Sequence, residues 1–100
     1  MNELIETKNI EVKEKFGENT LKTLCAFANT QGGKVILGVD DEGVVKGFKI
    51  DNNTLRDVTE RIVSELGIHP DIEIKDKDGK QIVEININKS NIPVSYKGKY

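Results

Sequence analysis

Residues 23–47 constrain the fold more than any other part of the chain. They predict a helix that stops at Gly32 and Gly33, because glycine readily adopts the left-handed conformation that ends helices. Residues 35–39 follow as a strand with apolar side chains on both faces, as expected of a central strand that is covered on both sides. A turn at residues 40–43 then leads into a second predicted strand at residues 44–48.

The segment before this stretch predicts a strand and the first turns of the helix. Ile10 and Val12 alternate with Glu11 and Lys13, so a strand would bury the first pair and present the second pair side by side. Residues 21–28 carry apolar side chains at helical spacing, which indicates a face directed toward a core.

The segment after it predicts a second helix and a hairpin. Residues 51–54 begin the helix, which has an apolar stripe and ends at Gly67. Two strands then flank a tight turn at Asp78 and Gly79. The expected class is α+β, a mixed β-sheet with helices packed on it, in the order β-α-β-β-α-β-β.

Composition places the chain among compact single domains and excludes several classes. Its 100 residues suit one domain, with 36% hydrophobic and 32% charged residues and a net charge of −2. The lone cysteine, Cys25, excludes an internal disulfide and fits a reducing compartment. No apolar run approaches the ~20 residues that cross a bilayer, and the polar N-terminal residues do not resemble a secretion signal. We therefore expect a cytoplasmic protein without a membrane partner.

Three motifs carry a resemblance to a known family. The sequence Glu11-Val12-Lys13, the run AFANTQGG at residues 26–33 and the run GVDDEGVVKG at residues 38–47 resemble the AlbA-type DNA-binding domain of the Schlafen group. An older description treated that domain as a divergent AAA, or ATPase, domain. The similarity covers essentially the whole chain, although the family usually has Phe where Val12 stands. It implies that residues 1–100 form one AlbA-type, Schlafen-core-like domain from a longer protein.

The resemblance implies two kinds of function. Bacterial proteins with this domain are described as transcriptional regulators or helicase-related proteins. This implies a non-catalytic module that binds nucleic acid, with DNA favoured over RNA as the ligand. The remainder of the parent protein and a second copy of the chain are further expected partners. Eukaryotic relatives include metal-dependent endoribonucleases whose two glutamates and one aspartate match Glu6, Glu11 and Asp41. If the domain is such a nuclease, Glu11 and Asp41 would hold Mg²⁺ or Mn²⁺. If it is a non-catalytic binding module, no particular cofactor is expected.

Simple geometry limits the carboxylate hypothesis. Residues five apart lie on opposite faces of one continuous strand, so Glu6 and Glu11 converge only if the chain bends near Asn9. The simpler interpretation makes Glu6 a solvated side chain and Asp41 a turn former, because Asp is favoured in such turns. We favour this simpler interpretation and keep the nuclease as the alternative.

Six residues are candidates for contacts with nucleic acid. Lys13 either neutralises a phosphate or pairs with Glu11, and the sequence leaves both open. The other five candidates are Asn29, Gly32, Gly33, Lys97 and Lys99. The glycines follow a helix C-terminus, which disfavours anions, and no G-x-x-x-x-G-K-[ST] loop is present, so ATP binding ranks low.

The acidic balance of the chain shapes the expected binding. A pI near 5.4 requires any phosphate-binding surface to be a local patch, such as the C-terminal lysines with Tyr96 between them as a stacking surface. A protein-interaction module that uses an exposed sheet edge is the third possibility.

Overall fold

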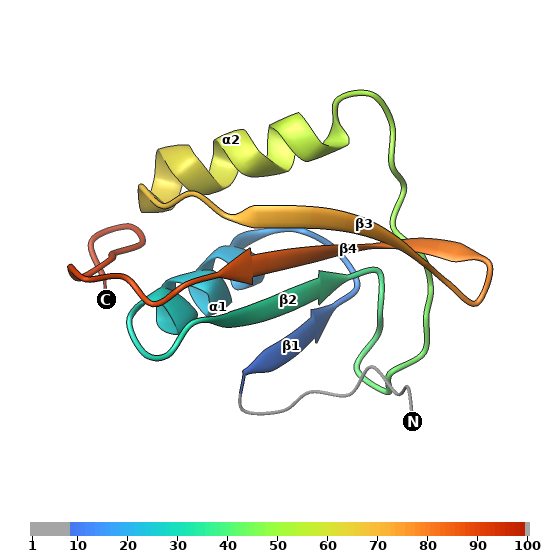
Figure 1. The fold of residues 1–100 in the computed structure, drawn as a ribbon, viewed down its shortest axis with the longest axis horizontal. Coiled ribbons are helices and arrows are strands. Elements are labelled where there is room, and N and C mark those ends of the chain that lie inside the picture. The colour runs from blue at the N-terminus through green and yellow to red at the C-terminus, as the bar shows by residue number, and fades with distance from the viewer. Residues whose placement is uncertain (1–8, 100) are drawn as a thin grey trace.

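A mixed four-stranded sheet forms the centre of the computed structural model, which describes residues 9–99. The strands are β1 (Ile10–Lys13), β2 (Gly33–Leu37), β3 (Asp71–Lys77) and β4 (Lys80–Ile87), in the spatial order β1-β2-β4-β3 (Figure 1). β1 and β2 run parallel, and the other two pairs are antiparallel. The predicted α+β class with a mixed sheet is therefore confirmed.

Helices α1 (Glu18–Ala28) and α2 (Thr54–Leu66) contribute to one core with the same face of the sheet. Leu21 and Leu24 of α1 are fully buried, as is Ile62 of α2. They pack with alternate residues of β2 and β4, including Val35 and Val83, which matches the period of two expected for strands. The apolar stripes read from the sequence are thus the surfaces that hold both helices on the sheet.

The opposite face of β2 is covered by the loop that follows it. Val39 and Val45 of this loop pack with Val12, Ile36 and Ile82 in a second, smaller apolar cluster. β2 therefore has buried side chains on both faces, as its sequence predicts. Within residues 9–99, no helix is both long enough and apolar enough to span a bilayer.

The strand expected at residues 44–48 is replaced by a closed loop. A single isolated bridge joins Val39 to Val45. Gly47 and the residue before it both donate their N–H groups to the Gly38 carbonyl, at 2.9 and 2.8 Å. The chain therefore turns back on Gly38 instead of running beside β2, and the observed order is β-α-β-α-β-β.

The two helix ends differ from one another. α2 ends as predicted, with Gly67 in the left-handed region at φ 71°. α1 ends at Ala28, and the left-handed residue is Gly32, whose N–H donates to the Phe27 carbonyl at 2.7 Å. The glycine pair thus closes a short turn after the helix and does not cap the helix directly.

Close packing explains why both glycines stand at this turn. A Cβ atom on Gly32 would lie 2.7 Å from the Ile87 carbonyl oxygen, and one on Gly33 would lie 2.8 Å from the Phe27 ring. Real Cβ atoms do not approach other atoms so closely, so the chain passes from α1 into β2 only where side chains are absent.

We expect Gly32→Ala to lower the free energy of unfolding by about 2–4 kcal/mol, through backbone strain and overpacking together. Gly67→Ala is the matched control, because Gly67 has a similar positive φ but a Cβ atom added to it would have nothing within 4 Å. Urea unfolding of both variants measures the difference. Equal losses in the two variants would contradict the packing explanation.

Candidate functional site

Glu11 and Lys13 lie side by side on the edge strand β1, as the sequence predicts. The register pairs them with Val35 and Leu37, so both side chains lie on the face of the sheet that carries the helices. The Lys13 Nζ atom is 3.8 Å from a Glu11 carboxylate oxygen, and both side chains are partly exposed. Such an ion pair contributes only about 0–1 kcal/mol, so stability alone is a weak reason for it.

The turn that carries Asp41 follows β2, and the residues just before it contact the end of β1. The Lys13 carbonyl accepts hydrogen bonds from the N–H groups of Gly38 and Val39, at 2.8 and 3.3 Å. Asp40 shapes the turn, because its carboxylate accepts two backbone N–H bonds at 2.9 Å. Asp41 itself is exposed. The expectation named Asp41 as the turn former, whereas the side chain that bonds the turn is that of Asp40. Asp41 occupies the first central position of the turn, which the Gly43 N–H closes on the Asp40 carbonyl.

The carboxylate trio is described only in part. Glu6 lies outside the described residues, so its place relative to Glu11 and Asp41 stays a prediction. Within residues 9–99, no three His, Cys, Asp or Glu side chains are arranged as a metal site. The Lys13 carbonyl binds Gly38 and Val39 at the start of the loop that carries Asp41, whereas Glu11 lies on the helix face of the sheet and this loop packs on the opposite face.

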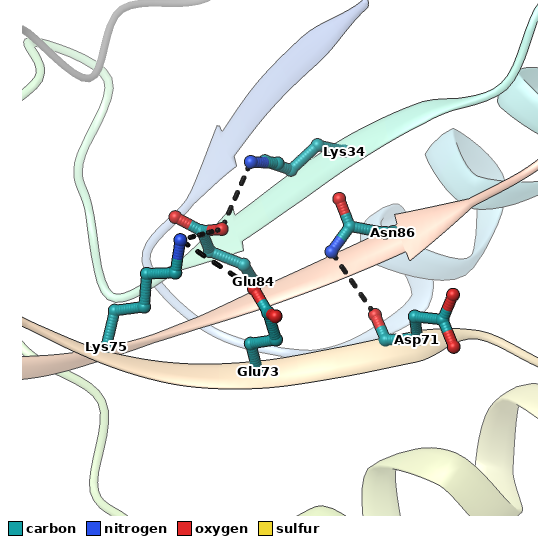
Figure 2. A network of polar contacts seen from close by, with 6 residues as sticks. All are labelled: Lys34, Asp71, Glu73, Lys75, Glu84 and Asn86. Atoms are coloured by element: carbon teal, nitrogen blue, oxygen red, sulfur yellow. Dashed lines mark hydrogen bonds and ion pairs between the residues drawn. The ribbon is translucent and has the colours of Figure 1, made fainter.

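On the face of the sheet away from the helices, the lysines of a polar network pair with carboxylates of the same network. Glu84, whose side chain is 9% exposed, lies 3.1 Å from Lys34 Nζ and 3.4 Å from Lys75 Nζ through one carboxylate oxygen (Figure 2). Glu73 is 3.7 Å from the same Lys75. Because two carboxylates already face these two lysines, this surface is a poor candidate for binding phosphate.

A groove of about 580 Å³ lies between α1 and the C-terminal segment. Its α1 side is a stripe with a spacing of four residues, which places side chains on one helical face. The residues that line it are Glu18, Lys22, Cys25, Ala26, Asn29, Thr30, Tyr96, Lys97 and Lys99. Lys22 and Ala26 were not predicted from the sequence. Their exposed i, i+4 spacing is the signal that identifies them.

Asn29 fixes the C-terminal segment against α1. Its side-chain amide donates to the Val94 carbonyl at 2.7 Å, and its side-chain oxygen accepts the Val94 N–H at 2.8 Å. The Cys25 thiol lies 3.2 Å from the same carbonyl, and burial raises the pKa of this thiol. Asn29 therefore positions the wall of the groove, and its amide is already engaged.

A tight turn presents the two tail lysines to the groove. Tyr96 and Lys99 exchange two backbone hydrogen bonds, at 2.7 and 3.0 Å. The central residues, Lys97 and Gly98, have φ angles of 52° and 80°, as in the two-residue turns that join tightly paired strands. A lysine in the left-handed region is strained, and such strain concentrates at functional sites.

One glutamate neutralises part of this basic surface. Glu18 accepts a hydrogen bond from Lys97 Nζ at 2.6 Å, and this bond lowers the pKa of Glu18 and raises the pKa of Lys97. The same ammonium lies 5.4 Å from the centre of the Tyr96 ring. Tyr96 is only 5% exposed, so the expectation that its ring offers an open stacking surface is wrong.

The predicted contact residues do not form one site. Asn29, Lys97 and Lys99 line the groove. Lys13 lines a separate hollow of about 400 Å³ before α1. Gly32 and Gly33 are explained by the packing described above. A role for each of these six residues in binding stays a prediction.

Comparison with known proteins identifies the family. The family model described as Schlafen, AlbA_2 matches residues 6–100. The chain belongs to this family. The resemblance to this family that was inferred from the sequence is therefore confirmed. In this member, the domain has a mixed sheet and two helices.

Two solved structures show the same fold as this family member. The N-terminal domain of a protein related to the ATP-dependent DNA helicase RecG, from Nitrosomonas europaea, is 26% identical with a TM-score of 0.78. The match covers 95% of this chain and 74% of that one. The DIP2311 protein from Corynebacterium diphtheriae is 19% identical with a TM-score of 0.74. There the match covers 94% of this chain but only 20% of the larger protein.

We expect Asn29→Ala to lower the free energy of unfolding by about 1–3 kcal/mol, because the Val94 N–H loses its partner and the Val94 carbonyl is left with the weaker Cys25 thiol donor. Exchange of the Val94 amide proton should accelerate, and Cys25 should react faster with a thiol reagent. Thr30→Ala is the control, since the exposed Thr30 hydroxyl bonds carbonyls of its own helical turn. Unchanged exchange at Val94 would show that Asn29 does not hold the segment.

Proposed function

We propose that this Schlafen AlbA_2 domain binds nucleic acid without cleaving it. The observation that carries the proposal is the gathering of Lys22, Lys97 and Lys99 around one groove, where Glu18 is the acidic lining residue. Neutralising phosphates with lysine supplies most of the affinity of sequence-independent binding. In a chain of net charge −2, a local excess of lysines gives nucleic acid a place to bind.

The comparisons support this proposal at a coarser level. A helicase-related protein has a domain of the same fold at its N-terminus, with 26% identity to this chain. Because that protein is related to a DNA helicase, the likeness favours nucleic acid as the ligand of this domain. We further propose that the domain serves a larger cytoplasmic regulator of transcription and that the parent protein supplies additional contacts, including those of a homodimer.

The direct test measures binding of labelled single-stranded RNA, single-stranded DNA and duplex DNA at several salt concentrations. Three lysine contacts predict a slope of log K against log salt of about −2 for a single strand. A shift that weakens with salt at this slope supports the proposal. Absence of any shift at low salt would refute nucleic-acid binding by this domain.

Replacing lysines of the groove should weaken binding more than replacing lysines elsewhere. We expect Lys22→Gln with Lys99→Gln to reduce affinity about tenfold and to reduce the salt slope by about 1.4. The matched control is Lys49→Gln with Lys80→Gln, which makes the same change in net charge at two other exposed positions. Equal losses in the two double variants would show that the groove lysines have no special role.

A metal-dependent nuclease is the second candidate, and one observation favours it. The Lys13 carbonyl at the end of β1 accepts the N–H groups of Gly38 and Val39, which places this edge strand beside the start of the loop that carries Asp41. Glu11 lies on the helix face of the sheet and the loop packs on the opposite face, so an ion held by both carboxylates would have to lie around the edge of the sheet. Two carboxylates are ligands that Mg²⁺ and Mn²⁺ accept, and such an ion would polarise a phosphate and activate a water. Lys13, 3.8 Å from Glu11, is available to the same phosphate.

If the domain is a nuclease, Glu11→Gln and Asp41→Asn should each reduce RNA cleavage at least a hundredfold while leaving the thermal midpoint within a few degrees. Glu42→Gln is the control, because Glu42 is an exposed acid of the same turn. The assay incubates labelled single-stranded RNA with Mn²⁺, with and without a chelator. Cleavage that a chelator stops would overturn the non-catalytic proposal, and intact RNA would refute the nuclease.

A further inference from the structure

The Tyr96 hydroxyl is buried and lacks a hydrogen-bond partner within residues 9–99. The residue is 5% exposed and is part of the lining of the groove. Buried hydroxyl groups almost always have a partner, so a buried hydroxyl without one requires an explanation. The hydroxyl is covered in the free protein, where Arg61 of α2 and Lys97 act on it electrostatically, so a ligand in the groove supplies the missing acceptor only if the turn that carries Lys97 moves on binding.

The surroundings of this hydroxyl suit an anionic ligand. Lys97 Nζ lies 5.4 Å from the centre of the Tyr96 ring, and Lys22 and Lys99 line the same groove. In the free protein, the Glu18 carboxylate accepts the Lys97 hydrogen bond at 2.6 Å. Glu18 is about half exposed, with a side-chain exposure of 52%, so it can turn toward solvent and leave Lys97 to another anion.

We propose that one unpaired nucleotide of a single-stranded nucleic acid occupies this groove. Its phosphate replaces the Glu18 carboxylate at Lys97, and an oxygen atom of the same nucleotide accepts the Tyr96 hydroxyl proton in a hydrogen bond. This inference rests on the proposed nucleic-acid binding and names the part of the ligand that enters the site.

The size and floor of the groove favour a single strand over a duplex. A volume of about 580 Å³ lies within the range of about 300–1,000 Å³ typical of small-ligand sites. Ala26, which is exposed in the middle of the α1 stripe, leaves room above the helix for a sugar and a base. A duplex keeps its bases paired and offers only its outer backbone, whereas an unpaired strand can direct a base into a pocket.

The first test fills the groove. Ala26→Glu adds bulk and negative charge to its floor, and Ser64→Glu makes the same charge change at an exposed position of α2 outside the groove. We expect Ala26→Glu to weaken binding of a labelled twelve-nucleotide strand at least tenfold and Ser64→Glu less than twofold, with either RNA or DNA. Equal affinities of the two variants would overturn the proposal.

The second test removes the hydroxyl alone. Tyr96→Phe should reduce affinity for the strand about tenfold, as loss of a hydrogen bond to an anionic group does. Its thermal midpoint should change by only a few degrees, because the hydroxyl makes no hydrogen bond within residues 9–99 and acts on Arg61 and Lys97 only electrostatically. A purely structural Tyr96 would lower stability on loss of its hydroxyl and leave affinity unchanged, which would contradict the proposal.

The third test removes the competing carboxylate. Glu18→Gln should increase affinity about threefold or more, because the phosphate no longer displaces a charged group from Lys97. Glu60→Gln, at an exposed position of α2, controls for the change in net charge. Equal gains in both variants would refute competition at Lys97.

The outcomes separate the groove from the function. The unmodified domain could bind single strands while the Ala26→Glu and Ser64→Glu variants bind them with equal affinity. In that case the groove is not the binding site, but the proposal of nucleic-acid binding stands. If the unmodified domain binds no nucleic acid, both proposals fail. Tighter binding of duplex than of single strand would overturn the inference, and so would saturable binding of adenosine monophosphate that a single strand does not displace.

Discussion

The pair of hydrogen bonds between the Asn29 side chain and the Val94 backbone determines the shape of the candidate site. Asn29 stands at the end of α1, and Val94 belongs to the segment that follows the last strand, 65 residues later. By imitating the paired bonds of a strand, one amide holds an irregular segment in a fixed place. The tight turn with Lys97 follows three residues after Val94. The contact between Asn29 and Val94 therefore holds this turn beside α1, where it forms one wall of the groove.

The sequence predicted the parts of the fold that depend on local pattern. The apolar stripes of α1 and α2 and the two-sided burial of β2 appear as expected, because burial of apolar surface dominates their placement. It failed at residues 44–48, where two backbone bonds to the Gly38 carbonyl replace a strand. Side-chain periodicity carries no information about such a closure, so the sequence could not show it.

The candidate site was less predictable because its walls are distant in the chain. Lys97 and Lys99 were identified by their local density, but Lys22 looks like any solvated helix residue until the C-terminal segment covers its face of α1. The partnerless hydroxyl of Tyr96 is visible only in three dimensions, since burial and pairing are properties of the packed molecule. The site thus combines a charge excess that sequence suggests with a cavity that only the fold creates.

The most direct measurement follows backbone amide shifts of the ¹⁵N-labelled domain as an unlabelled single strand is added. The account predicts that saturable shifts cluster along the exposed stripe of α1 through Lys22 and Ala26 and in the turn around Lys97. Shifts confined to β1 and the turn at Asp41, with the groove unaffected, would contradict it.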